Sequence, residues 1–498
     1  MLGIDFTKIS ELLMFDQSDP LLFGSSLFLF LFFALLVVNS FFAKSNNTRI
    51  SILILFSLYI YYKASGIFLL LLILNAIINF FFGKCMGNSK TQSGKRLFLI
   101  LSILFNIGLL FYFKYTNFFI QALIDFQIGN FELLNIILPL GISFYTFKSL
   151  SYILDIYLET MEPTESFRDY FLFVTFFPNI LSGPIDRAVK FLPQIRKEYF
   201  LSDKDVAMGL FLIMMGLVKK IMIADYISLN FVDRVFDSPI RFTGVENLLA
   251  VYGYALQLYC DFSGYSDIAI GVGLLLGFKL MENFNYPFKA KSISDFWKRW
   301  HISLSSWLLD YVFRPLQIGL RDWRKAGNIT ALVITFVLVG FWHGASWAFL
   351  FWGLLHGIYM AIGLLVQGPK RKFYLKHKLN NSKILGAIQI FVTFNLVAFS
   401  FIFFRASDFS SALDVVKQIV FFFKPSVFIQ FINSFTPTFI LIFIGFLFHF
   451  LPSSLGDWTV NLLSKMNVFV QAIILTIIIW LVTQAQYADL QPFIYFQF

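Results

Sequence analysis

Charged residues are scarce in this sequence, and cysteine is almost absent. Asp, Glu, Lys and Arg make up 14% of the 498 residues, whereas soluble globular proteins contain about a quarter. This deficit excludes an ordinary soluble protein. The two cysteines, Cys85 and Cys260, cannot supply a disulfide framework or a cysteine-rich metal site.

The motifs of several common enzyme classes are also missing. The chain has no G-x-S-x-G turn, no cysteine–histidine arrangement and no H-E-x-x-H zinc motif. These absences exclude the usual serine and cysteine nucleophiles and a zinc site. We therefore expect no metal and no tightly bound cofactor.

Hydrophobic residues, in contrast, make up 58% of the chain, and 68 residues are phenylalanine. The apolar runs are long and unbroken rather than alternating, which indicates helices and not a β-barrel. The sequence predicts an all-α polytopic integral membrane protein with on the order of a dozen crossings of about 20 residues each. The expected spans include Leu133–Leu154, Tyr170–Leu181, Leu248–Tyr259 and Ile268–Phe278.

Basic residues give the chain a net charge of +10 and gather in short loops between the expected spans. By the positive-inside rule these loops face the cytoplasm, so the charge indicates membrane topology and not nucleic-acid binding. The clusters are Lys84–Arg96, Arg196–Lys204, Lys289–Arg299, Arg321–Lys325 and Lys370–Lys378. An alternative for residues 289–325 is that they bind an anionic donor, such as a nucleotide or a phosphopantetheine group.

Three polar segments interrupt the apolar pattern: 139–145, 178–185 and 260–267. The last places Asp261 and Asp267 between two apolar runs. Irregular backbone at membrane depth is tolerated where protein buries it or where it lines a wet cavity. The segments favour a polar interior, and kinked but well-packed helices are the alternative. A fourth segment, Ile293–Pro315, interleaves aromatic and basic residues and predicts a helix at the membrane interface.

His343 lies within the apolar run from Ala331 to Phe351. A histidine inside a membrane span is costly and commonly marks a functional site, although it can also simply bond a neighbouring helix. On a continuous helix it would share a face with Gly340, Ser346 and Trp347. The small residues Gly340, Gly344, Ala345 and Ser346 would leave open space for a substrate beside it. A neutral imidazole can remove a proton from a hydroxyl group, which suits acyl transfer from a thioester.

Several long motifs resemble the membrane-bound O-acyltransferases (MBOAT), in particular the bacterial branch of alginate O-acetylation proteins. They lie at residues 182–187, 262–269, 283–288, 294–304, 340–347 and 493–498, and the resemblance runs from about Lys114 to the C-terminus. It implies one transmembrane domain over 1–498, with a core at about 114–404, N-terminal spans at 22–113 and C-terminal spans at 437–486. It also implies re-entrant and interfacial helices around a central funnel.

The resemblance implies that His343 is catalytic, and that His301 is the second characteristic residue, which binds or orients the donor. Further residues that could line the site are Ser263, Tyr265, Asp267, Trp297, Arg299, Trp300, Asp310, Trp342 and Ser346. For Asp310, an ion pair with Arg314 one helical turn later is an equal alternative.

For this branch the resemblance implies that acetyl-CoA, or another acyl thioester, donates an acetyl group from the cytoplasmic side of a bacterial inner membrane. An extracytoplasmic acetyltransferase partner and an exported polysaccharide would receive it, with membrane lipid around the protein. The alternatives are transfer of D-alanine from a carrier protein to teichoic acid, and a transporter without chemistry of its own. Asp261 and Asp267 within the expected spans are compatible with the transporter.

Overall fold

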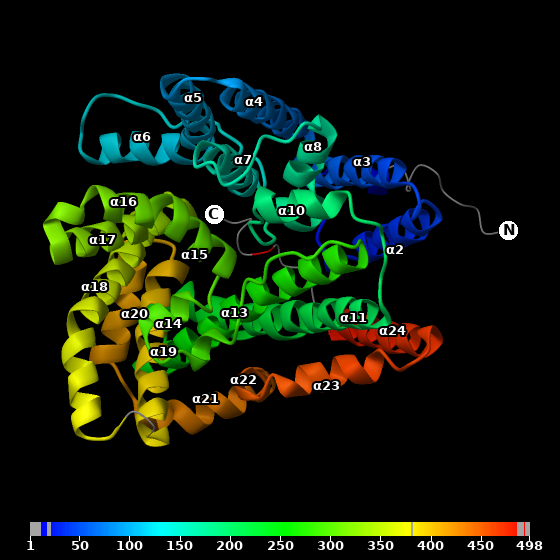
Figure 1. Ribbon diagram of the computed structural model, residues 1–498. Coiled ribbons are helices and arrows are strands. Elements are labelled where there is room, and N and C mark those ends of the chain that lie inside the picture. Colours follow the sequence, from blue (N-terminus) through cyan, green and yellow to red (C-terminus); the bar gives the residue numbers. More distant parts are fainter. Residues whose placement is uncertain (1–10, 17–20, 380–381, 486–492, 494–498) are drawn as a thin grey trace. The chain divides into compact units, whose positions relative to one another are not determined.

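The computed structural model describes residues 11–16, 21–379, 382–485 and 493. Within these residues the chain forms helices and no strand, which confirms the all-α prediction (Figure 1). The chain divides into two compact units. Unit 1 comprises Met1–Ile213 and Ile268–Met281, and unit 2 comprises Met214–Asp267 and Glu282–Phe498. Of the expected C-terminal motif 493–498, residues 494–498 lie outside the described part.

The helices of unit 1 are α2 (Ser26–Phe41), α3 (Asn46–Ser65), η1 (Gly66–Phe68), α4 (Leu69–Asn88), α5 (Gln92–Leu110), η2 (Phe111–Tyr115), α6 (Thr116–Asp125), α7 (Ile142–Tyr157), α8 (Phe167–Thr175), α9 (Phe177–Ile180), α10 (Ala188–Ile195) and most of α11 (Asp203–Leu217). The earlier helices of unit 2 are η3 (Val218–Asp225), η4 (Ser228–Val232), α12 (Asp233–Phe236), η5 (Pro239–Arg241), most of α13 (Gly244–Leu275), η6 (Pro287–Lys289), α14 (Ile293–Trp297), α15 (Ile302–Leu308), η7 (Leu309–Phe313), α16 (Arg314–Gly319) and η8 (Arg321–Trp323). The later ones are α17 (Arg324–His343), α18 (Trp347–Lys376), α19 (Lys383–Arg405), α20 (Phe409–Phe421), η9 (Pro425–Val427), α21 (Phe428–Ser434), α22 (Thr436–Phe450), α23 (Ser454–Leu463) and α24 (Val468–Ala485).

Six helical segments in the described part of the chain are long and apolar enough to cross a membrane. The number rises to eight if each of two sharply bent pairs counts as one span: 409–434, bent by 95°, and 436–463, bent by 90°. This is fewer than the dozen expected, because some expected spans join in one helical segment, as in Asn46–Asn88 and α13, and others are broken. The expected span 133–154 is not helical until Ile142, and the run 170–181 breaks at Phe176.

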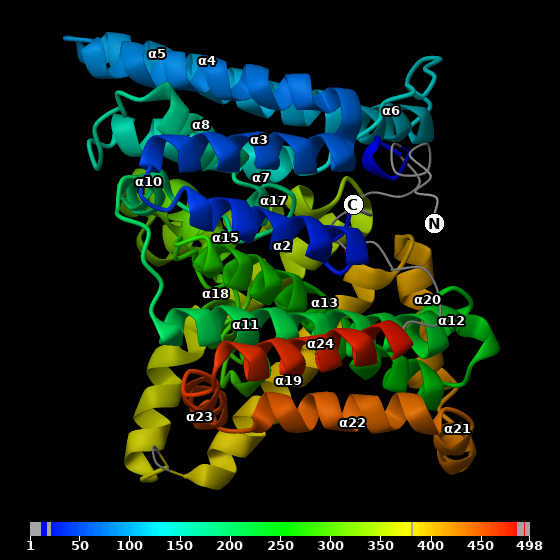
Figure 2. The same ribbon diagram turned by 90° about the vertical axis from the view of Figure 1, so that its right-hand side faces the viewer.

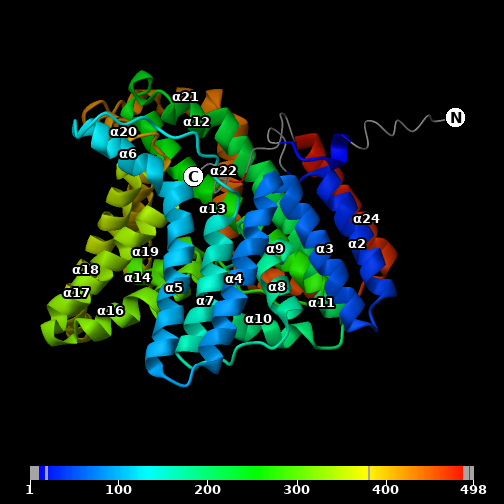
Figure 3. The same cartoon turned by 90° about the horizontal axis from the view of Figure 1, so that it is seen from above.

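In unit 1, α4, α5 and α7 lie side by side (Figures 2 and 3). Fully buried polar side chains link them. Asn75 Nδ2 donates to Asn106 Oδ1 at 2.8 Å, and Ser149 Oγ donates to Asn75 Oδ1 at 2.8 Å. Asn79 Oδ1 accepts from Ser102 Oγ and Asn106 Nδ2, each at 2.8 Å. Amide and hydroxyl pairs of this kind hold helices together in lipid, where the hydrophobic effect contributes little between helices.

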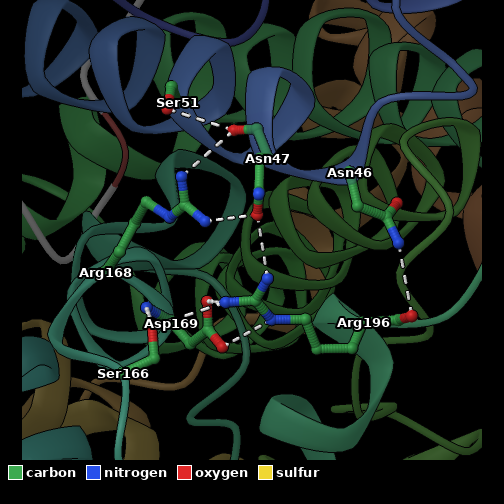
Figure 4. A network of polar contacts seen from close by, with 7 residues as sticks. All are labelled: Asn46, Asn47, Ser51, Ser166, Arg168, Asp169 and Arg196. Carbon is green, nitrogen blue, oxygen red and sulfur yellow. Dashed lines mark hydrogen bonds and ion pairs between the residues drawn. The ribbon is translucent and has the colours of Figure 1, made fainter.

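One predicted basic loop also holds helix ends together in unit 1 (Figure 4). Arg196, at the end of α10, donates from Nε and Nη2 to the two carboxylate oxygens of Asp169 on α8, at 2.8 and 2.7 Å. Its Nη1 donates to Asn47 Oδ1 at 3.0 Å, and Arg168 donates to the same oxygen. The positive charge at this position therefore joins α3, α8 and α10, in addition to any role in topology.

In unit 2, the segment 260–267 is helical throughout, as part of α13. The expectation of irregular backbone there was wrong, because lysines from η3 neutralise the carboxylates. Lys220 Nζ lies 2.6 Å from Asp261 and 2.8 Å from Asp225, and Lys219 Nζ lies 2.7 Å from Asp267. Gly264 sits between the two aspartates, and a Cβ there would lie 2.8 Å from the carbonyl oxygen of Gly216. The close approach of η3 lets the ion pairs form without breaking the helix.

Candidate active site

His343 is the last residue of α17. The backbone of Gly344 is extended, and α18 starts at Trp347 after Ser346, whose Oγ accepts from the Phe349 N–H at 3.4 Å. The expectation that His343 shares a helical face with Ser346 and Trp347 was wrong, because the helix is not continuous there. Ser346 caps the second helix of a hairpin.

Glycines near His343 bring α17 and α18 into close contact. A Cβ on Gly340 would lie 2.2 Å from the carbonyl oxygen of Phe349 and 3.0 Å from the Cα of Gly353. A Cβ on Gly344 would lie 2.2 Å from the Phe349 ring. The expectation of open space at Gly340 and Gly344 was therefore wrong. Helix backbone and an aromatic ring fill the volume that the missing side chains leave.

Aromatic rings surround the His343 imidazole, which is 2% exposed. The ring centroids of Trp342, Trp352 and Phe404 lie 4.8, 5.1 and 5.1 Å from it, all with edge-on geometry. Trp352 comes from α18 and Phe404 from α19. Three helices thus restrict the orientation of one imidazole in an apolar enclosure.

His301 lies between α14 and α15, where its backbone has φ 44° and ψ 54°. Non-glycine residues seldom adopt this left-handed conformation, and it concentrates at functional sites. Two backbone hydrogen bonds hold the turn: the Ile302 N–H donates to the Asn283 carbonyl at 2.9 Å, and the Asn285 N–H donates to the Arg299 carbonyl at 2.9 Å. The amphipathic stretch 293–315 is therefore not one helix but several short ones, with His301 at a break.

The side chain of His301 is completely buried. Its Nδ1 lies 3.3 Å from Asn283 Oδ1, and the ring of Phe262 packs edge-on against it with centroids 4.6 Å apart. Burial lowers the pKa of His301 to about 3. The imidazole is therefore neutral near pH 7, with a hydrogen on one ring nitrogen and a lone pair on the other.

Trp342 connects the two histidines. Its ring centroid lies 6.0 Å from that of His301 and 4.8 Å from that of His343. Of the predicted site residues, His301, Trp342 and His343 thus come together in unit 2, although 42 positions separate the histidines in the chain.

Three further predicted residues pack around the α14 end of unit 2. Trp297 Nε1 donates to His356 Nδ1 at 3.2 Å, and His356 Nε2 lies 2.9 Å from Ser400 Oγ. Trp300 stacks on Phe296 with centroids 5.4 Å apart. Arg299 donates from Nε to Asp295 at 2.9 Å. Each of these three side chains therefore has a partner within unit 2.

The predicted residues on α13 divide between its faces. At about 100° per residue, Phe262 and Ser266 lie opposite Gly264, the centre of the face that meets η3. Asp267 flanks Gly264 and pairs with Lys219, whereas Tyr265 stacks on Phe493 with centroids 4.5 Å apart. Ser263 is 1% exposed. One face of α13 thus carries the ion pairs, and the opposite face contacts His301 and Asn283.

Asp310 Oδ1 accepts from Arg314 Nη1 at 2.7 Å, which is the alternative that the spacing predicted. The described residues contain no group of three or more histidines, cysteines, aspartates or glutamates arranged to hold a metal ion.

Sequence reasoning assigned no role to Asn283, Trp352 or Phe404, which contact the two histidines. Asn283 was part of a matching motif, and this was the only signal that could have singled it out. Trp352 and Phe404 lie in ordinary apolar runs, where nothing distinguishes them from other aromatic residues of a span.

Comparison with known proteins identifies the class. The sequence model of MBOAT, the membrane-bound O-acyltransferase family, matches residues 164–405. The chain is 36% identical over 430 residues to the peptidoglycan O-acetyltransferase of Helicobacter pylori, covering 80% of each chain. It is 36% identical over 397 residues to the probable alginate O-acetylase AlgI of Pseudomonas aeruginosa, covering 78% of this chain and 72% of the relative.

A more distant similarity links it to the teichoic acid D-alanyltransferase of Bacillus subtilis, at 32% identity over 282 residues, which are 55% of this chain and 70% of the relative. The chain belongs to the membrane-bound O-acyltransferase family. It is a multi-pass membrane protein and an O-acyltransferase, which removes the alternative of a transporter without chemistry.

Proposed function

We propose that this enzyme takes an acetyl group from acetyl-CoA on the cytoplasmic side of a bacterial inner membrane and passes it outward for O-acetylation of an exported or cell-surface polysaccharide. The observation that carries the proposal is the meeting of His301 and His343 at Trp342. The printed names of its relatives support acetyl transfer: the acetylating relatives match 80% and 78% of the chain, whereas the D-alanyltransferase matches 55%.

In the proposed reaction, neutral His343 acts as general base. It removes the proton from an acceptor hydroxyl as that oxygen attacks the thioester carbonyl. The new C–O bond forms while the C–S bond breaks, and the imidazolium returns its proton to the departing thiolate. His301 orients the donor. Positioning plus a base is sufficient because a thioester is already reactive.

The proposed direction of transfer across the membrane rests on the positive charge of the loops. The basic loops are expected to face the cytoplasm, where acetyl-CoA is made, and the acceptor and its acetyltransferase partner lie outside. The broken spans and the bent helix pairs 409–434 and 436–463 would let the two substrates approach from opposite sides, because irregular backbone at membrane depth commonly borders a cavity.

Transfer of D-alanine to teichoic acid is the second candidate, since the Bacillus subtilis relative carries that name. It differs in its donor, which would be a carrier protein and not coenzyme A. The basic segment 289–325 is compatible with either anionic donor.

The test is turnover of radiolabelled acetyl-CoA by the purified protein in liposomes. Wild type is compared with His343→Ala and with the matched control His377→Ala, since His377 is an exposed histidine at the end of α18. We expect label transfer or release by wild type and His377→Ala but not by His343→Ala. Equal rates in all three would contradict the role of His343. Activity only with D-alanyl carrier protein would favour the second candidate.

A further inference from the structure

The side-chain oxygen of Asn283 lies at the centre of a buried hydrogen-bond arrangement that includes His301. Three groups converge on its side-chain oxygen: the Ser303 N–H at 3.2 Å, Ser303 Oγ at 2.6 Å and His301 Nδ1 at 3.3 Å. Its amide nitrogen donates to Ser266 Oγ at 3.2 Å. All four residues are buried.

The orientation of the Asn283 amide follows from a backbone group. A backbone N–H can only donate, so the atom that faces the Ser303 N–H must be the oxygen and not the NH2 group. This removes the ambiguity that usually attends asparagine side chains. The group that faces His301 Nδ1 is therefore an acceptor, and Nδ1 must supply the hydrogen.

We propose that Asn283 is a positioning residue that holds His301 as its Nδ1–H tautomer, so that Nε2 keeps the lone pair. Only the expected effect on activity rests on the function proposed for His301. The tautomer itself follows from the geometry. Nε2 is then the ring nitrogen that can accept a hydrogen bond when His301 orients the donor. The left-handed turn at His301 and the backbone bond from Ile302 to Asn283 keep the imidazole against this amide.

The contact with Asn283 favours the Nδ1–H tautomer because the Nε2–H tautomer would cost free energy. If the hydrogen moved to Nε2, two lone pairs would face each other at Nδ1 and Asn283 Oδ1 in a buried site. A buried polar atom that loses its hydrogen bond costs about 1–3 kcal/mol. Fixing the tautomer of a functional histidine through its other nitrogen is how an orienting partner acts on an imidazole base.

The first experiment needs no substrate. Solid-state NMR of the full-length protein with 15N-labelled histidine in lipid distinguishes protonated from unprotonated ring nitrogens, and His301→Gln assigns the His301 signals. In wild type near neutral pH we expect a hydrogen on Nδ1 and an unprotonated Nε2. Finding the hydrogen on Nε2 in wild type would overturn the proposal, whatever the enzyme transfers.

Two substitutions then distinguish an effect on the His301 tautomer from an effect on packing. Asn283→Asp keeps an acceptor for Nδ1–H and Ser303, so the tautomer should persist and much of the activity should remain. Asn283→Leu removes the acceptor, so we expect signals of both tautomers and a loss in kcat of at least about tenfold. A variant Asn283→Leu that kept both the wild-type tautomer and the wild-type kcat would overturn the proposal.

Asn247 provides the matched control. It is also fully buried, on the first turn of α13, where its Nδ2 donates to the carbonyls of Pro239, Phe242 and Thr243 at 3.0–3.2 Å. Asn247→Leu should lower thermal stability and leave the His301 tautomer unchanged. A shift of the tautomer in Asn247→Leu equal to that in Asn283→Leu would mean that any loosening of unit 2 has this effect, and the role of Asn283 would be lost.

Discussion

The indole of Trp342 lies 6.0 Å from the imidazole of His301, measured between ring centroids. Trp342 is also the neighbour of His343 in sequence and packs against it at 4.8 Å. A single rigid side chain thus sets the separation of the two histidines. We therefore expect the size and shape of this ring to matter for the geometry of the site.

Replacing Trp342 tests this arrangement. Trp342→Phe keeps an aromatic ring, whereas Trp342→Ala leaves a cavity that lets both imidazoles move, and small displacements of reacting groups cost about a hundredfold in rate. We expect Trp342→Ala to lower kcat by at least about tenfold and Trp342→Phe to lower it much less. Trp347, which is 54% exposed, is the control. An equal loss in Trp347→Ala would point to general damage to the hairpin.

The glycine contact between α17 and α18 gives a second prediction. Gly340→Ala would place a methyl group 2.2 Å from the Phe349 carbonyl oxygen, so the helices must separate. Overpacking of this kind costs about 1–3 kcal/mol. We expect a lower thermal midpoint and reduced activity, because His343 lies one turn away. A methyl group on Gly363, which lies on α18, would meet no atom within 4 Å, so Gly363→Ala should keep or raise stability. Equal destabilisation by both would contradict this account.

The amino-acid sequence predicted the class of protein well. The apolar composition indicated a helical membrane protein, and the motifs around His301 and His343 indicated the family. Three features escaped it. Glycines beside His343 suggested open space, yet Gly340 and Gly344 allow close packing, because the same small residue serves either purpose and only the neighbouring helix decides.

The continuity of α13 was also unpredictable from the sequence, and the reason is similar. Asp261 and Asp267 argued for a break, and their partners Lys220 and Lys219 lie more than 40 positions earlier. The position of Asn283 against His301 likewise depends on a turn that brings together residues 18 positions apart. Local patterns identify helices and their apolar faces, but they do not identify pairings between segments that are distant in sequence.

Asp310 allows the two interpretations of its carboxylate to be separated. If it acts only through Arg314, Asp310→Asn and Arg314→Gln should have the same small effect. The Arg314 side chain is 61% exposed, so solvent screens the pair and the free energy of unfolding should change by less than about 0.5 kcal/mol. Thermal unfolding and kcat of both variants are the measurements. A fall in kcat in Asp310→Asn alone would show that Asp310 takes part in substrate binding.

The pair Lys219–Asp267 should matter more, because its side chains are only 21% and 20% exposed. Asp267→Asn leaves the lysine without its carboxylate, and because the pair is part-buried this should cost more than the loss of an exposed pair, which is worth about 0–1 kcal/mol. The double variant Lys219→Met with Asp267→Leu should recover much of that loss. Thermal unfolding in lipid nanodiscs measures both. If Asp267→Asn were as stable as wild type but inactive, Asp267 would line the site, as the motif first suggested.

The buried His301 also predicts how stability depends on pH. Histidine in an unfolded chain has a pKa of about 6.5, and burial lowers the pKa of His301 in the folded protein to about 3. Above about pH 6.5 both states are neutral at this residue and its contribution is fully present. As the pH falls from there towards 3, the unfolded state binds a proton that the folded state does not. Stability is then lost, with a limiting slope of about 1.4 kcal/mol per pH unit.

His301→Gln should therefore lose less stability than wild type between about pH 7 and pH 5, since glutamine has no proton to bind. Thermal midpoints of the two proteins, measured across this range in the same detergent, test the difference. His377→Ala, which removes an exposed histidine, should follow the wild-type curve. Parallel curves for wild type and His301→Gln would mean that folding does not change the proton affinity of His301, and a neutral His301 imidazole at lower pH would lose its support.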